Sequence, residues 1–377
     1  MMRNCANCIY HSNLPYITLD ESGVCNLCRQ IEMMKNKFNT GNDQGLRELE
    51  DKFSEIKRNG AGKKYDCIIG VSGGVDSSYL LYLAHIKNLR VLAVHYDNTW
   101  NSAIASQNIV SIVRELDIDL YTYVVDSEEA SDIFYSFFKA GVPELEAATD
   151  LAFAYILRKV ARKNNIRYIL EGHSFEAEGI TPLNNNYFDG RYIKNIHQKY
   201  GTVKLKSYPL MTFSKFLFSS IFYKVEIVRP LWHVRYSKKE AIRLLEEKFN
   251  WEYYGGHHLE NYMSAFLHTI YLPTKFGLDF RLHTLSAQVR SGEIARIEAE
   301  NLMKMPNKKI DDLILYLCNR LRISQDDYAR IMNSEKRSWQ EFKTYKNYFY
   351  HFRKIFLYLA NRNRVPWSFY MKYCEKR

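Results

Sequence analysis

Strand-like and helix-like segments alternate through the middle of the chain, and this alternation limits the fold more than any other feature. Short apolar runs predict five strands, and longer helical patterns lie between the first four. The predicted strands are Tyr65–Val71, Arg90–Tyr96, Leu120–Asp126, Arg167–Glu171 and Lys224–Arg229. The predicted helices are Asp76–Lys87, Ser102–Leu116, Ser127–Lys139 and Ala147–Lys163. This order is typical of a doubly wound α/β domain with a parallel sheet, which binds ligands at the carboxyl ends of its strands.

The segment that follows the first predicted strand has the features of a phosphate-binding loop. Residues 70–78 read GVSGGVDSS. Gly73 and Gly74 allow the backbone to turn sharply and to approach a ligand closely, and the N–H groups that open the next helix point into the loop. Ser72, Ser77 and Ser78 add hydroxyl donors. The spacing and the lysine of a Walker loop are missing, so the segment predicts a phosphate cradle of another kind.

Four of the seven cysteines form two CxxC pairs near the N-terminus, namely Cys5, Cys8, Cys25 and Cys28. Each CxxC turn can direct two thiolates at one tetrahedral ion, and Gly23 stands where a tight knuckle needs a glycine. We therefore expect a structural Zn²⁺ site. An iron–sulfur cluster and free or redox-active thiols are the alternatives.

Composition and charge indicate a globular protein with an anionic partner. Hydrophobic residues make up 46% of the chain and charged residues 25%. The formal charge of +11, with 29 tyrosines and 21 phenylalanines, favours a nucleotide, an acidic sugar, RNA or an acidic membrane surface. The N-terminus has no apolar segment of signal-peptide length, so we expect a cytoplasmic protein.

One stretch of the chain, Ser207–Tyr223, is rich in apolar and aromatic residues. It falls short of the ~20 residues that cross a bilayer and contains Lys215, so no transmembrane segment is expected. A buried or partly buried helix is the main interpretation. Contact with a membrane surface or a partner is the alternative.

The alternation of strands and helices ends near Ser237. Ser237 and Glu240 predict a capping box, and helical patterns follow at Lys239–Phe249, Leu259–Tyr271, Ser286–Met303 and Ile310–Asn319. We expect four parts: a knuckle at 1–35, a helical connector at 36–64, the α/β domain at 65–235 and a helical domain at 236–377. The helical domain would cover the mouth of the site or dock a partner. The tail from Ser334 is basic and aromatic, which indicates covered helix faces, with RNA binding as the alternative.

The loop SGGVDS, residues 72–77, resembles the SGGxDS loop of the PP-loop ATP pyrophosphatases. That superfamily includes GMP synthetase, NAD synthetase, asparagine synthetase and several tRNA-thiolating enzymes. The resemblance implies an adenine nucleotide α-hydrolase-like fold with ATP and Mg²⁺ as cofactors. It also implies that the loop holds the pyrophosphate while ATP is cut between its α and β phosphates.

A wider resemblance covers nearly the whole chain. The segments GVCNLC, YDCIIGVSGGVDSSYL, LAVHYDNTWNS, IKNIHQKYGTVKLKSYP, IVRPLWHVRYSKKEA and LPTKFGLDFR are similar to those of N-acetyl sugar amidotransferases of bacterial surface-polysaccharide biosynthesis. The family turns a sugar acetamido group into an acetamidino group. The implied substrate is an N-acetylated sugar acid, either nucleotide-linked or a free nonulosonic acid.

Ammonia for this reaction is expected to come from a partner. The chain has no N-terminal nucleophilic cysteine and no cysteine in a glycine-flanked elbow. The resemblance implies partners like the glutaminase and cyclase subunits of imidazole glycerol phosphate synthase, and no nucleic acid. An amide oxygen is a very poor leaving group, so we expect that AMP is first transferred to it and that ammonia then displaces AMP.

The resemblance assigns roles to residues at the ends of three predicted strands. Those implied to contact ATP, its pyrophosphate or its metal are Ser72, Gly73, Gly74, Asp76, Ser77, Val94, His95, Asp97 and Gly172. Asp76, Ser77 and Glu178 are the implied catalytic residues. For Asp76 the alternative is an acid that stabilises the helix N-terminus. The GH at 172–173 departs from the threonine and asparagine expected in the family, which leaves the role of His173 open.

Two further clusters are candidates for sugar recognition. They comprise Asp189, Arg191 and Lys194 in FDGRYIKNIH, and His258 and Glu260 in YYGGHHLE. Their basic members could hold the carboxylate or diphosphate of an activated sugar acid. Surface charges around a helix start are the alternative interpretation of both clusters.

Two other functions compete with the sugar amidotransferase. A PP-loop tRNA-modifying enzyme would suit the knuckle, the basic charge and EGHS, but most thiolating relatives need a reactive cysteine, and Cys67 lies inside a predicted strand. A non-catalytic ATP-binding scaffold of a glutaminase complex is the other rival. The intact SGGVDS argues against it.

Overall fold

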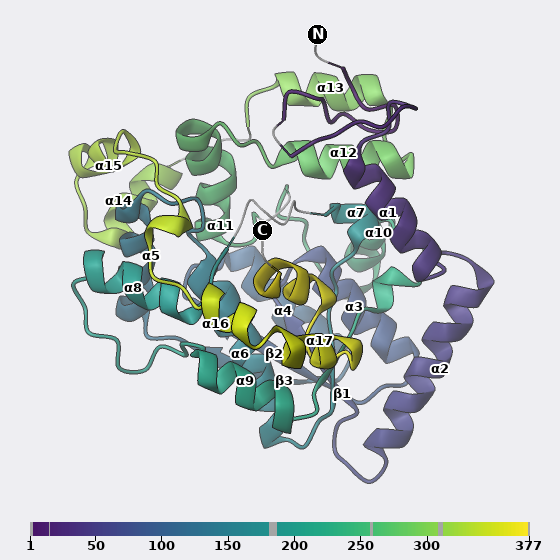
Figure 1. Cartoon of the computed structure of the whole chain (residues 1–377). Coiled ribbons are helices and arrows are strands. Elements are labelled where there is room, and N and C mark those ends of the chain that lie inside the picture. The colour runs from purple at the N-terminus through teal and green to yellow at the C-terminus, as the bar shows by residue number, and fades with distance from the viewer. Residues whose placement is uncertain (1–2, 15, 181–186, 257–258, 308–311, 376–377) are drawn as a thin grey trace.

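The computed structural model describes residues 3–14, 16–180, 187–256, 259–307 and 312–375. Its centre is a parallel sheet of five strands: β1 (Cys67–Val71), β2 (Val91–Asp97), β3 (Asp119–Val124), β4 (Tyr168–Leu170) and β5 (Glu226–Val228). Their order is β3-β2-β1-β4-β5. The predicted doubly wound parallel sheet is therefore confirmed (Figure 1).

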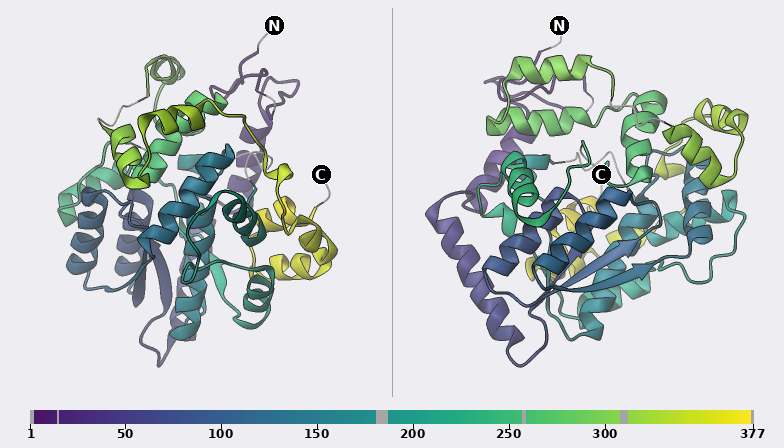
Figure 2. Two further views of the ribbon diagram at one scale, coloured as in Figure 1. Left: turned by 90° about the vertical axis from the view of Figure 1, so that its left-hand side faces the viewer. Right: turned by 180° about the vertical axis from the view of Figure 1, so that it is seen from behind.

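Helices cover both faces of the sheet because alternate strand residues point to opposite sides. Cys67, Ile69 and Val71 pack against α2 (Asp43–Gly60), α3 (Val75–Ile86), α4 (Ala103–Glu115) and α10 (Lys238–Phe249). Ile68 and Val94 face α6 (Ala147–Lys163) on the other side. Figure 2 shows this layering from two further directions. All four helices predicted within the α/β domain form, including α5 (Ser127–Ala140).

The chain reverses its direction across the sheet at one place. It runs from β1 outward to β2 and β3, and then returns to place β4 on the other side of β1. The gap between the carboxyl ends of β1 and β4 is thus a topological switch point, where ligands of such sheets bind. The loop with the paired glycines leaves β1 at this gap.

The predicted connector is two helices rather than one segment. α1 (Asn26–Lys37) begins inside the knuckle, because the Cys25 side chain caps it, and α2 follows. Between β4 and β5 lie α7 (Phe175–Glu178), α8 (Gly190–Tyr200) and α9 (Phe213–Phe222). Of the apolar stretch at 207–223, only α9 is helical, and no described helix is long and apolar enough to cross a bilayer.

The C-terminal region is helical as predicted, but two of its helices differ from the prediction. The pattern at 259–271 is α11 (Tyr262–Phe266) followed by a π-helix, Leu267–Phe276. The pattern at 286–303 is two helices, α12 (Arg281–Ser291) and α13 (Arg296–Lys304), because Gly292 ends the first with a φ of 78°. The remaining helices are α14 (Leu313–Leu321), α15 (Gln325–Met332), α16 (Lys346–His351), α17 (Arg353–Asn361) and α18 (Trp367–Phe369), with a last π-helical turn at Tyr370–Cys374.

Three packing relations connect this region to the rest. Leu245 and Phe249 of α10 share a core with β1 and α3, so the start of the expected helical domain packs directly on the α/β layer. α11 and α14 share a second core with α5 and α8. α12 and α13 pack against the N-terminal knuckle, as Figure 1 shows at the top of the view. The domain boundaries themselves stay predictions.

Candidate functional site

The loop between β1 and α3 is shaped by Gly73. Its φ of +79° lies in the left-handed region, and a Cβ at this position would lie 2.2 Å from the carbonyl oxygen of Ala105. Any side chain there would have to displace the backbone of α4. The glycine therefore allows both the turn and its close packing on the neighbouring helix.

Hydroxyl groups fix the rest of the loop. The Gly74 N–H donates to Ser72 Oγ at 3.2 Å, and Ser77 Oγ donates to the Gly74 carbonyl oxygen at 3.2 Å. Ser72 itself is exposed. The loop lines a cleft of about 220 Å³ into which the N-terminus of α3 opens. A helix N-terminus beside exposed hydroxyls is suited to a phosphate group.

Gly172 closes the same cleft from β4. A Cβ on Gly172 would lie 2.9 Å from the carbonyl oxygen of Asp76, so only a glycine allows this approach to the start of α3. The predicted Ser72, Gly73, Gly74, Asp76, Ser77 and Gly172 thus lie together at the switch point.

Asp76 and Glu178 meet across a lysine that the sequence analysis did not identify. Lys238 Nζ lies 2.9 Å from Asp76 Oδ2 and 3.5 Å from Glu178 Oε1, and all three side chains are mostly buried. The Tyr236 hydroxyl donates to Asp76 Oδ1 at 2.5 Å. Burial acts to raise the pKa of Asp76, but the Lys238 ammonium together with hydrogen bonds with Glu178, Lys238 and Tyr236 holds this pKa below its usual value. Burial likewise opposes the charge of Lys238, whose pKa is nevertheless raised by Asp76 and Glu178.

A sequence signal for Lys238 exists in hindsight. It occupies the first turn of α10, directly after the cap Ser237. A cation at a helix N-terminus is unfavourable unless a carboxylate compensates it. The signal does not distinguish Lys238 from Lys239, which shares this turn and is exposed.

His173 follows Gly172 and joins this group. Its Nε2 lies 3.7 Å from Glu178 Oε2. The His173 side chain is 45% exposed, and partial loss of water around the ring and the Arg229 guanidinium lower the pKa of His173, so the imidazole is neutral at pH 7. A neutral ring beside Glu178 can accept or donate a hydrogen bond in the cleft.

His95 stands at the end of β2 with both ring nitrogens engaged. Its Nδ1 lies 3.0 Å from the Val71 carbonyl oxygen and must donate to it, so its Nε2 accepts from the Asn101 amide at 3.1 Å. His95 is buried and lines a second, larger cavity beside the cleft. The predicted Val94 does not reach this space, because its side chain is fully buried in the core against α6. Asp97 instead supports the next loop by accepting from the Thr99 N–H at 2.7 Å.

The loop from β2 to α4 is held in a strained conformation by the C-terminal region. Thr99 has a φ of 66°, which is unfavourable for a β-branched residue. Arg320 of α14 donates from Nη2 to the Thr99 carbonyl oxygen at 3.0 Å and to its Oγ1 at 2.5 Å. The same guanidinium lies 5.3 Å from the ring centre of the buried Trp100. Such strain persists only where the surroundings impose it, and it occurs most often at functional sites.

A second cavity, of about 560 Å³, adjoins the cleft. Ser72, Phe153 and Glu260 line both spaces. The cavity's walls come from the knuckle, from the loop after β2, from α6 and from residues 260–303. Glu144 lies in this wall and accepts from the Tyr192 hydroxyl at 3.0 Å, while burial raises its pKa to about 7. The larger cavity can therefore hold a second substrate beside whatever occupies the loop.

Of the residues predicted to recognise a sugar, Glu260 alone among those described lines the cleft. Asp189 caps α8, and its carboxylate accepts from the Tyr187 hydroxyl and from the Tyr345 N–H, so it acts as a structural cap. Arg191 donates to the Thr344 carbonyl oxygen, and Lys194 is exposed on α8; neither lines the two spaces. His258 lies outside the described residues.

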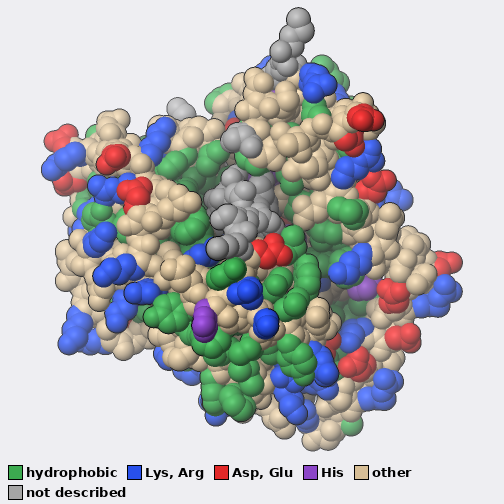
Figure 3. All heavy atoms as spheres, viewed as in Figure 1, with side chains coloured by type: hydrophobic (Ala, Val, Ile, Leu, Met, Phe, Trp, Pro, Cys, Tyr) green, Lys and Arg blue, Asp and Glu red, His purple; other side chains and the backbone are tan. Residues whose placement is uncertain are grey.

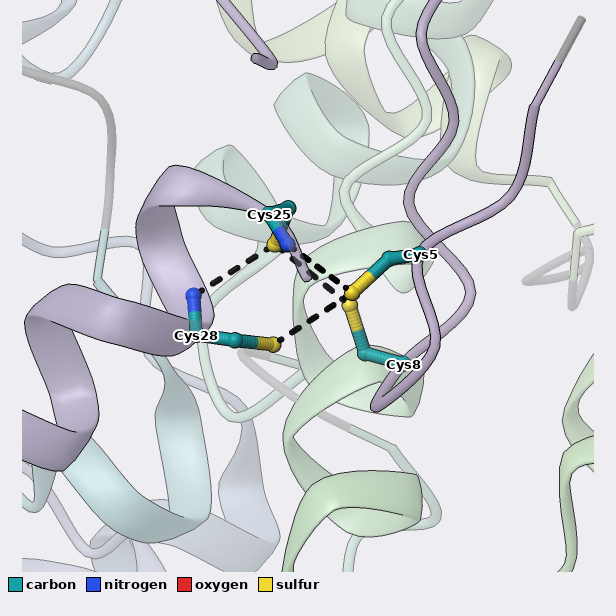
Figure 4. Close-up of side chains that lie close together, drawn as sticks. All are labelled: Cys5, Cys8, Cys25 and Cys28. Carbon is teal, nitrogen blue, oxygen red and sulfur yellow. Dashed lines mark hydrogen bonds between the residues drawn. The ribbon is translucent and has the colours of Figure 1, made fainter. Parts of the chain in front are cut away.

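The four N-terminal cysteines converge as predicted (Figure 4). All four Sγ atoms lie within 4.8 Å of one another, with 3.8 Å between Cys5 and Cys28 and 3.8 Å between Cys8 and Cys25. A tetrahedron of Zn–S bonds of about 2.3 Å has edges of about 3.8 Å. A four-iron cube would separate the sulfurs further, because each thiolate then binds a different iron. The donor set therefore fits one tetrahedral ion.

Two arginines attach this knuckle to the C-terminal region. Arg290 Nε lies 3.3 Å from Cys28 Sγ, and Arg296 donates to the carbonyl oxygens of Cys5, Ala6 and Cys8 at 2.6–2.8 Å. The Arg290 charge offsets part of the negative charge that four thiolates bring to the ion. Because α12 and α13 also line the larger cavity through His283 and Met303, an ion bound by the four cysteines would support a wall of the candidate site.

Replacing Lys238 tests the charge arrangement in the cleft. In Lys238→Met, Asp76 and Glu178 lose the ammonium between them, and we expect ATP turnover to fall by about 10²–10³. Lys239→Met changes the exposed neighbouring lysine and should leave turnover unchanged. Thermal unfolding of both variants separates loss of the fold from loss of the site. Equal turnover in the two variants would contradict the assignment.

Replacing Arg320 tests the strained loop. We expect Arg320→Met to release Thr99, to increase hydrogen exchange of residues 97–102 and to lower turnover. Adding Thr99→Gly should restore much of both, because glycine adopts this φ without strain. Arg322→Met is the matched control, since Arg322 is exposed. If Thr99→Gly failed to restore protection to exchange, the arginine would have a different role.

Metal analysis tests the knuckle. We expect one zinc ion per chain in protein purified under anaerobic conditions, and no visible absorption of an iron–sulfur cluster. Cys28→Ser should lose the ion and lower the unfolding temperature, whereas Cys318→Ala, outside the cluster, should retain zinc. Stoichiometric iron and sulfide would contradict the geometry.

Solved structures that resemble this chain share little of its sequence. Solved structures with similar elements include NMN synthetase from Francisella tularensis, with 11% identity and a TM-score of 0.33, covering 78% of this chain and 98% of that one. The U34-tRNA thiolase NcsA from Methanococcus maripaludis, solved with its [4Fe-4S] cluster, has 14% identity and a TM-score of 0.32, covering 86% and 99%. The NH₃-dependent NAD synthetase from Campylobacter jejuni has 12% identity and a TM-score of 0.32, covering 78% and 98%.

TM-scores of this size do not show a common fold. The α/β architecture follows instead from the strand order of the parallel sheet. No curated protein matches the chain. A family model described as "LPS biosynthesis protein WbpG-like, C-terminal domain" matches residues 260–356. These residues include part of the wall of the larger cavity and Arg320. Residues 260–356 of this chain are therefore similar to the C-terminal domain of WbpG-like lipopolysaccharide biosynthesis proteins.

Proposed function

We propose that this protein is an ATP-dependent amidotransferase of bacterial surface-glycan biosynthesis. It converts the acetamido group of an N-acetylated sugar acid into an acetamidino group and releases AMP and pyrophosphate. A partner glutaminase with a cyclase-like subunit supplies the ammonia. The observation that carries the proposal is the junction of two spaces: the phosphate-binding cleft opens directly into a larger cavity that the WbpG-like domain helps to enclose.

The cleft is suited to the pyrophosphate part of ATP. Ser72 and the N-terminus of α3 offer hydroxyl and N–H donors, and Lys238 offers a positive charge. The carboxylates of Asp76 and Glu178 are ligands of the type that Mg²⁺ prefers, and a bound Mg²⁺ would neutralise charge on the departing pyrophosphate. Donors fixed before the reaction cost no reorganisation when the charge develops.

A second substrate bound in the larger cavity would lie next to the same loop, because Ser72 lines both spaces. An amide oxygen directed at the α-phosphorus from this side can attack it, and pyrophosphate leaves toward the loop. The product is an O-adenylated imidate, whose carbon is now a good electrophile. Ammonia adds to that carbon, and AMP leaves with the former amide oxygen, so all atoms of the acetamidine are accounted for.

The cysteines bear on the source of ammonia and on the rival reaction. Cys67, Cys318 and Cys374 are buried, and none lines either space among the described residues. Burial raises the pKa of Cys67 well above its usual value, which makes it a poor nucleophile. These positions favour ammonia from a partner and disfavour a thiolating enzyme that needs a reactive cysteine beside ATP.

The test is turnover with ATP, Mg²⁺, ammonium and a panel of nucleotide-linked and free N-acetyl sugars. We expect AMP, pyrophosphate and a sugar product lighter by about one mass unit. In Gly73→Ala the new methyl group meets the Ala105 backbone, so turnover should fall at least 10²-fold. Gly62→Ala is the matched control, because Gly62 has a similar φ of 75° but open surroundings.

Three outcomes would contradict the proposal. Formation of ADP would show that ATP is cut at a different bond. AMP release that responds to tRNA but to no sugar of the panel would favour the tRNA-modifying alternative. Nucleotide binding without turnover under every condition would leave only the non-catalytic scaffold.

A further inference from the structure

The surface formed by α9 and the C-terminal helices α16–α18 has a basic and apolar composition that the proposed reaction does not use. The inner face of α9 packs on these helices: Phe213 contacts Phe349 and Phe356, and Phe216 stacks on Phe356 and Phe369. Arg364 Nη1 donates to the Ile221 carbonyl oxygen at 2.8 Å. The two segments therefore form one structural unit, although more than 100 residues separate them in sequence.

The outer faces of this unit carry large apolar side chains. Phe218 and Phe222, one helical turn apart on α9, are 49% and 62% exposed and contact each other with ring centres 4.6 Å apart and ring planes tilted by 37°. The exposed apolar residues of the C-terminal helices are Tyr348, Ile355, Tyr358 and Trp367. Figure 3 shows hydrophobic side chains gathered on the lower part of the face where α9, α16 and α17 lie, with Lys and Arg side chains beside them.

The charge of this unit is entirely positive. Residues 342–374 contain seven Lys or Arg and no Asp or Glu, and α9 contains Lys215 and no acidic residue. Lys215, Lys224, Lys354 and Arg362 are exposed. Eight basic residues and no acidic residue in these two segments are not explained by a mixed solvated surface, in which both signs are interspersed.

We propose that this surface, defined by α9 and residues 342–374, binds the face of a membrane that contains anionic lipids. Apolar and aromatic side chains enter the headgroup region, and the Lys and Arg side chains around them attract the lipid charge. No segment has to cross the bilayer, in keeping with the short α9. The protein would act as a peripheral protein beside the membrane.

The composition of this surface favours an anionic lipid over an acidic protein or RNA. Five of the eight basic residues of α9 and residues 342–374 are lysines, which are depleted in protein–protein interfaces but bind anionic lipid well. RNA binding needs aromatic faces that are free to stack on bases. Here the Phe218 and Phe222 rings contact each other in a tilted arrangement, and the aliphatic Ile355 shares the surface.

Vesicle sedimentation of the full chain tests the proposal. We expect binding to vesicles of phosphatidylcholine with about 30% phosphatidylglycerol, little binding to phosphatidylcholine alone, and at least a fivefold loss between 0.1 and 0.5 M salt because the charges are screened. Phe218→Ser with Phe222→Ser should reduce binding at least fivefold. Met33→Ser with Ile297→Ser removes two apolar residues that are each 64% exposed elsewhere, and should have no effect.

Charge reversal gives a second, independent variant. Lys354→Glu with Arg362→Glu should weaken binding, whereas Lys57→Glu with Arg58→Glu on α2 should not. Thermal unfolding of every variant checks the fold. The proposal is overturned if the wild type ignores anionic vesicles, if neutral vesicles bind equally, or if both pairs of reversals act alike. Binding of a single-stranded RNA that these same changes abolish, without vesicle binding, would assign the surface to RNA.

Discussion

The ammonium of Lys238, placed between the carboxylates of Asp76 and Glu178, is the interaction on which the candidate site depends. It connects α10 to the first turn of α3 and to α7, so three segments far apart in sequence enclose one cleft. Two carboxylates this close and this buried would repel each other without a cation. The cleft therefore holds one cation between two carboxylates. In the proposed reaction, the phosphates of ATP and their metal would change this balance of charge.

The C-terminal region acts mainly by holding other parts of the molecule in place. Arg320 imposes the strained loop that positions Asn101 beside His95, while Arg290 and Arg296 fix the four-cysteine knuckle over the larger cavity. All three arginines lie within residues 260–356, which match the WbpG-like C-terminal domain model. Each contact joins this region to a segment whose neighbouring residues line the larger cavity, so one region holds both the loop and the cavity wall.

The sequence was informative where the signal was local and much less so where it was distant. Periodicity located every strand within about two residues, and paired glycines and paired CxxC turns located the loop and the knuckle, because their chemistry is contained in a few neighbouring positions. Lys238 and Arg320 were missed because their partners lie 162 and 221 residues away. Asp189 resembled a ligand for the same reason that it is a good helix cap, since both roles need a short carboxylate.

The central claim is that the loop retains the two outer phosphates of ATP while the inner one is transferred to an amide oxygen. Its most direct test uses an N-acetyl sugar whose acetamido oxygen is ¹⁸O, with mass spectrometry of the nucleotide product. The account predicts that the label appears in the phosphate of AMP and is absent from pyrophosphate. Label in inorganic phosphate, or label retained by the sugar in a reaction that still forms AMP, would contradict it.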